Sequence, residues 1–178
     1  LKGIDSDALR FYWWYLRSVE NLTVPVDFYE DEVRKIWGLY PISYLHKQCL
    51  RYVDILREQN SSITPLLEQA NIKLKDTYTQ LVKDQPMWQA TCNLLFDESF
   101  EGDGKFIVFP TDSSRKLFSR ALMVRCGISS EDLIELNTWL FSLKEISMVI
   151  RFLESGEDVQ QLPFSVPQYI SDYSLILV

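Results

Sequence analysis

The chain has 178 residues and a net charge of −7, with 47% apolar and 13% aromatic residues. This length suits one hydrophobic core, and the apolar content excludes a disordered chain. The acidic balance argues against a domain that grips phosphate backbone, because such domains are typically basic. No apolar run approaches the roughly 18 residues of a membrane-spanning helix. We expect one soluble, intracellular domain over residues 1–178, cut from a longer protein because the sequence opens at Leu1.

Residues that cap or break helices predict helices along most of the first half. After the first helix, Pro25 is expected to interrupt the chain, and the polar residues 60–62 form a short turn. The expected helices and the residues that begin or end them are 6–21 (Ser6), 27–38 (Asp27 with Glu30, closed by Gly38), 44–59 (Ser43), 64–83 (Thr64 with Pro65) and 86–96 (Pro86).

The second half opens on an acidic loop at about 97–105, whose carboxylates lack the spacing of a calcium loop and predict a solvated turn. Residues 106–109 form a short extended piece. Thr111 begins a helix that stops at Gly127, and Ser129 or Ser130 begins another. Because the apolar period continues from 133 to 153, we expect one long helix there. The fold class predicted is all-α, a compact bundle of about seven to nine helices.

Residues for catalysis are scarce. His46 is the only histidine, and the three cysteines, far apart in the chain, are expected to be reduced thiols. His46 and Cys49 lie three residues apart on one helix face, which makes half of a zinc site that a partner would have to complete. The alternative is a helical histidine that packs or hydrogen-bonds near the surface. We expect no enzyme and no cofactor, apart from that possible interfacial zinc.

Apolar residues exceed what one stripe of a helix requires in two places. In the first helix, aromatic residues follow one another so closely that they cover every face, and the predicted long C-terminal helix repeats the pattern. Either neighbours bury both helices on all sides, or the surplus forms a dimer or partner interface. The interface expected comprises Phe11, Tyr12, Trp13, Trp14, Tyr15, Leu16, Trp139, Leu140, Leu143, Ile146, Val149 and Ile150.

A run within residues 44–74 resembles the telomere-repeat-factor homology domain of shelterin proteins. That family has a long helix, a turn, and a helix opening with Thr-Pro-Leu, matched here by residues 50–57 and by Thr64-Pro65-Leu66. The first helix also falls where the family places its dimerising helix. The sequence departs from the family in a shorter loop before Ile63, without the aromatic residue used in peptide docking, and in having no Myb-type module.

The resemblance implies a non-catalytic adaptor in the nucleus, at the chromosome telomere. Such a protein, similar to the bridge subunits of yeast shelterin, homodimerises and binds short peptide segments of other telomere proteins, with no direct contact to nucleic acid or membrane. The alternative is a segment of a larger helical scaffold, of the nuclear-pore or vesicle-coat kind. The tail 174–178 is expected to pack back on the bundle or to join the docking surface. Partner docking is expected at Tyr44, His46, Tyr52, Leu175 and Leu177.

Overall fold

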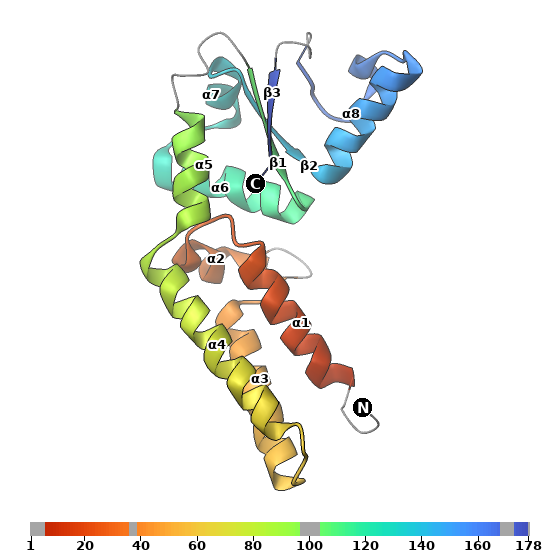
Figure 1. Ribbon diagram of the computed structural model, residues 1–178. Coiled ribbons are helices and arrows are strands. Elements are labelled where there is room, and N and C mark those ends of the chain that lie inside the picture. Colours follow the sequence, from red (N-terminus) through yellow and green to blue (C-terminus); the bar gives the residue numbers. More distant parts are fainter. Residues whose placement is uncertain (1–5, 36–38, 97–103, 168–172, 178) are drawn as a thin grey trace. The chain divides into compact units, whose positions relative to one another are not determined.

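The computed structural model in Figure 1 describes residues 6–35, 39–96, 104–167 and 173–177. Where the sequence predicted a single domain, the chain contains two compact units, residues 1–86 and 87–178. The expectation of a mostly helical protein is confirmed. The expectation of an all-α bundle does not extend to the second unit, because a parallel sheet lies there.

The described part of the first unit is helical. Its elements are α1 (Ser6–Glu20), α2 (Val26–Glu32), the 3-10 turn η1 (Val33–Lys35), α3 (Ile42–Glu58) and α4 (Thr64–Lys83). α1 packs against α3 and α4, which also pack against each other. The Tyr12 hydroxyl lies 3.5 Å from the Cys49 carbonyl oxygen and 3.4 Å from that of Leu67, and it donates toward both helices.

The helix starts of this unit differ from the prediction in their capping residues. Pro25 and Pro41 precede α2 and α3, and neither helix has a side-chain cap. Instead, Ser43 donates from its N–H (3.0 Å) and its hydroxyl (2.6 Å) to the Glu30 carboxylate, which ties α3 to α2. Thr64 is buried inside α4 and the N-cap is Ile63. Sequence alone could not show this, because one hydroxyl can serve its own helix or a neighbour. The predicted stop at Gly38 lies outside the described residues.

The second unit combines a small sheet with helices. Its elements are α5 (Pro86–Leu95), β1 (Gly104–Phe109), α6 (Asp112–Cys126), α7 (Ser130–Glu135), β2 (Thr138–Ser142), α8 (Leu143–Ser155), the 3-10 turn η3 (Val159–Gln161) and β3 (Tyr173–Leu177). The strands are parallel in the order β2-β1-β3, so β1 is central. Pairing of β3 with β1 confirms that the C-terminal tail packs back, here as a strand. The predicted extended piece is β1, while most of the predicted acidic loop lies outside the described residues.

Helices cover both faces of this sheet (Figure 1). On one face, Phe106 and Val108 of β1 and Phe141 of β2 pack with Ile146 and Val149 of α8. On the other face, the Phe109 ring lies 5.0 Å from the Phe118 ring of α6, measured between centroids. β1 is buried throughout, as is usual for a central parallel strand that is covered on both sides.

The long helix predicted for 133–153 is wrong. The segment contains the end of α7, the strand β2 and the start of α8. Asn137, in a left-handed conformation (φ 51°), separates α7 from the strand. The Ser142 side chain then forms a capping box with Glu145, which begins α8. The predicted caps at Thr111 and Ser129 and the predicted stop at Gly127 are confirmed.

Candidate functional site

The first helix has one side in the core and one side in solvent. Tyr15 is fully buried, while Phe11, Tyr12 and Trp14 are half-buried. On the solvent side, Leu9, Trp13 and Leu16 are 48%, 59% and 40% exposed. Their spacing of four and three residues places them in one line along the helix. We call these three residues the α1 seam.

Beside α1, aromatic rings of the first unit stack on one another. The Tyr40 ring lies between those of Trp14 (centroids 5.2 Å apart) and Tyr44 (5.6 Å), and both pairs are nearly parallel. Phe11 contacts Trp14 edge-on at 5.6 Å and Tyr52 at 5.8 Å. These ring contacts account for part of the aromatic surplus, because they fix the half-buried side of α1 against α3. The α1 seam has no such cover among the described residues.

His46 and Cys49 lie on α3 as the sequence predicted, but they differ in access. The His46 ring is half-buried, edge-on to Tyr15 at 5.6 Å between centroids. Cys49 is fully buried, and burial raises the pKa of its thiol to about 12. A zinc ligand must be a thiolate, so Cys49 is poorly suited to a site shared with a partner. Among the described residues, no three His, Cys, Asp or Glu side chains gather to hold a metal ion.

The predicted interface and docking residues divide between the units. Tyr44, His46 and Tyr52 lie on α3, near α1. Trp139 and Leu140 lie on β2 and not on a helix, half-buried. On α8, Ile146 and Val149 belong to the core, while Leu143 (48%) and Ile150 (46%) are exposed. Of the predicted docking residues in β3, Leu177 is 71% exposed, and the side chain of Leu175 lies outside the described part.

A cavity of about 310 Å³ runs along β2 in the second unit. The residues lining it come from both sides of the sheet and from β2 itself: Arg115, Ser119, Ser130, Leu133, Ile134, Thr138, Trp139, Leu140, Phe141, Glu145, Phe164 and Ser165. Because β2 is an edge strand, one cavity can touch both sides of the sheet only by passing around its outer edge. We call this cavity the β2 groove.

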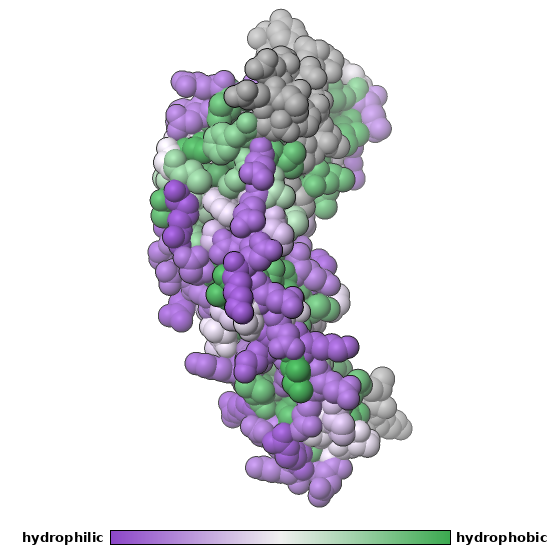
Figure 2. All heavy atoms as spheres, turned by 60° about the vertical axis from the view of Figure 1, so that its left-hand side comes forward, coloured by the Kyte–Doolittle hydropathy of each residue, from purple (hydrophilic) through white to green (hydrophobic). Residues whose placement is uncertain are grey.

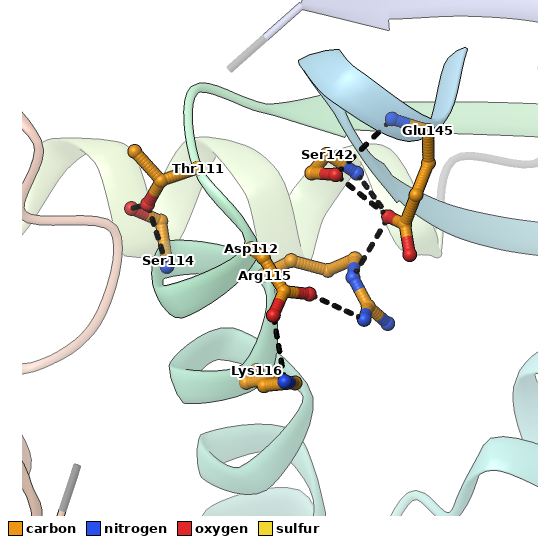
Figure 3. A network of polar contacts seen from close by, with 7 residues as sticks. All are labelled: Thr111, Asp112, Ser114, Arg115, Lys116, Ser142 and Glu145. Carbon is orange, nitrogen blue, oxygen red and sulfur yellow. Dashed lines mark hydrogen bonds and ion pairs between the residues drawn. The ribbon is translucent and has the colours of Figure 1, made fainter. Parts of the chain in front are cut away.

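A polar network closes the groove where β2 ends (Figure 3). Arg115 Nε lies 3.1 Å from Glu145 Oε2, and Arg115 Nη2 lies 2.7 Å from Asp112 Oδ1. The same Glu145 oxygen accepts from the Ser142 N–H at 2.7 Å. A hydrogen bond from Lys116 and the guanidinium of Arg115 lower the pKa of Asp112. The network therefore ties the first turns of α6 and α8 together with a balanced set of charges.

The sequence analysis missed both the seam residue Leu9 and the lining of the β2 groove. A period of four and three from Leu9 through Trp13 to Leu16 was present in the sequence and would have shown the seam. The groove was not accessible to sequence reasoning, because its lining comes from segments scattered from Arg115 to Ser165 and from a strand read as helix.

No protein-family model, curated protein or solved structure matches this chain. Within the ranges that the structure describes, no helix is long and apolar enough to cross a bilayer. Figure 2 shows one face of the molecule, on which hydrophobic residues form separate patches in a mainly hydrophilic surface.

Proposed function

We propose that this chain is a non-catalytic adaptor that pairs with a second copy of itself through the α1 seam. The observation that carries the proposal is the division of α1 into a buried side, centred on Tyr15, and an exposed apolar line of Leu9, Trp13 and Leu16. Residues four and three apart form the seam through which two helices pack in water. A self-complementary contact of this kind closes on a twofold axis and gives a dimer.

A second copy is the occupant we favour because the surroundings of the seam suit helix-to-helix packing. Arg10 and Arg17 extend over the Trp14 and Trp13 rings, at 4.9 Å and 5.6 Å from their centroids. Arg17 also pairs with Glu20 at 3.5 Å on the same helix. The aliphatic stems of such arginines enlarge the apolar strip while their charges stay in water, as in residues that flank coiled-coil seams. A telomeric role for the dimer rests on the sequence resemblance alone.

Light scattering of wild type and the Trp13→Glu variant tests the proposal. Wild type is expected to have the mass of a dimer, and the variant that of a monomer, because a carboxylate without a partner in a desolvated contact costs about 3 kcal/mol or more. The melting temperature should change little, since Trp13 is 59% exposed in the single chain.

Ile72→Glu is the matched control. Ile72 lies on α4 in the same unit and is 60% exposed, so the same change in polarity falls on a residue outside the seam. The control should remain a dimer. A monomeric wild type, or a dimeric Trp13→Glu protein with an unchanged dissociation constant, contradicts the proposal.

A further inference from the structure

The outer edge of β2 has main-chain groups that no described strand pairs. The sheet order places β2 at one side of β1, and the pairs run from Lys105↔Thr138 to Phe109↔Ser142. The Lys105 N–H donates to the Asn137 carbonyl at 2.9 Å, so Asn137 directs its main chain toward β1. Each residue of a parallel strand turns both groups to one side and its successor turns them to the other. Thr138, Leu140 and Ser142 therefore direct theirs outward.

The three outward positions are not equally available. The Ser142 N–H is already bound by the Glu145 carboxylate at 2.7 Å. Leu140, in the middle of β2, has no partner for its outward N–H and C=O in the hydrogen bonds of the described residues. These groups lie in the β2 groove, since Leu140 and its neighbours Trp139 and Phe141 line it.

The sequence of the edge lacks the usual protection. Natural edge strands are blocked by charged side chains, proline or bulges, because an exposed edge pairs with other chains. Thr138 to Ser142 contain neither charge nor proline. The only charges along the groove, on Arg115 and Glu145, pair with each other at its end and do not extend over β2. The edge is thus open to another strand and closed at one end by an ion pair.

From this geometry we infer that the β2 groove binds an extended segment of a partner protein, which adds to the sheet as a strand beside β2. The main chain of the segment pairs with the N–H and C=O of Leu140. Its side chains alternate between two walls, one with Ser119, Leu133 and Ile134 and the other with Phe164 and Ser165. Because the lining charges neutralise each other, we expect an uncharged segment with apolar and small polar residues. The five-residue strand spans about 17 Å, which corresponds to a partner segment of about five residues.

The probe is a library of random linear peptides of about seven residues displayed on phage, selected against the full chain. Selected peptides are then synthesised with a methyl group on one main-chain nitrogen at a time. Strand addition uses the N–H of every second residue, so methylation should weaken binding by about tenfold at alternate positions and leave the others unchanged. A ligand held only by its side chains shows no such alternation.

Two variants locate the binding on the protein. Leu140→Pro removes the outward N–H without removing a bond to β1, and proline is tolerated on an edge strand whose N–H faces outward. Ser130→Trp fills the groove from an exposed position on α7 and keeps β2 intact, so it provides the test if Leu140→Pro does not fold. Both are expected to weaken peptide binding at least about tenfold. Ser147→Trp, exposed on α8 and not part of the groove lining, is the control and should bind as wild type.

Failure to select peptides, an absence of alternation on methylation, or equal binding by Ser130→Trp would each overturn the inference. A loss of dimer mass in Ser130→Trp would overturn it in favour of an edge-to-edge dimer. This inference is independent of self-association through α1, because Trp13→Glu should bind the selected single peptides with wild-type affinity.

Discussion

His46 shows how a single side chain links packing in the first unit to pH. Its ring, on α3, meets the fully buried Tyr15 of α1, and Lys75 of α4 is the nearest charge that acts on it. Burial, together with the Lys75 ammonium, lowers the pKa of His46 below its usual 6.5. Its Nδ1 atom has no hydrogen-bond partner within the described residues, so the neutral ring is the form that the fold accommodates.

The free energy of unfolding should therefore fall as the pH drops through about 6.5. The unfolded chain takes up a proton on His46 there, whereas the folded chain does so only at lower pH, so protonation favours unfolding. Urea midpoints between about pH 7.5 and pH 5 should show this slope in wild type and a flatter one in His46→Gln. Asp112 and Asp132 also have lowered pKa values, but they act only near and below their usual 3.8. Equal slopes in both proteins would contradict the assignment.

At the scale of elements, α8 depends on the residues at its first turn. Ser142 is buried at the end of β2, its hydroxyl oxygen accepts from the Glu145 N–H at 3.3 Å, and the Glu145 carboxylate returns to the Ser142 N–H. Ser142→Ala should lower the free energy of unfolding by about 1 kcal/mol, measured by urea denaturation. Ser147→Ala is the control, because that hydroxyl bonds only the Leu143 carbonyl within α8. Equal losses in the two variants would show that the cap adds nothing.

The same turn explains why sequence reasoning failed at β2. A short apolar run such as Trp139-Leu140-Phe141 fits either a buried strand or one side of a helix, and periodicity alone does not separate the two. The Ser142-x-x-Glu145 spacing was a capping-box signal in the middle of the predicted helix, and it would have divided that helix correctly. In contrast, Gly127 and Thr111 marked helix ends correctly, because a left-handed stop and a hydroxyl cap are local.

Long-range pairing was beyond the sequence. β3 pairs with β1 in register from Gly104↔Tyr173 to Val108↔Leu177, although about seventy residues of chain separate them. Its apolar sequence predicted that the tail packs back, but nothing local selected a strand. The candidate sites divide in the same way. The α1 seam lies on one helix and was partly predicted, whereas the β2 groove assembles four elements and a loop and was not.

For the whole molecule, the two proposals combine into a bivalent adaptor. The α1 seam lies in the first unit and would join two copies, while each copy has one β2 groove in its second unit. A dimer then offers two identical grooves, and a partner with two copies of the bound segment can engage both. Linking two binding segments makes the second binding step intramolecular, which raises affinity without a new contact.

Tandem peptides test this bivalence. Two copies of a selected peptide, joined by flexible Gly/Ser linkers of about 20, 40 and 80 residues, cover a range of spans. Against wild type, the best linker should lower the dissociation constant about a hundredfold relative to the single peptide, as measured by calorimetry. Trp13→Glu should bind the single peptide normally and lose this gain, because its grooves are no longer joined. Ile72→Glu should keep the gain. If no linker improves binding to wild type, or if Trp13→Glu shows the same improvement, the two surfaces do not act together in one dimer.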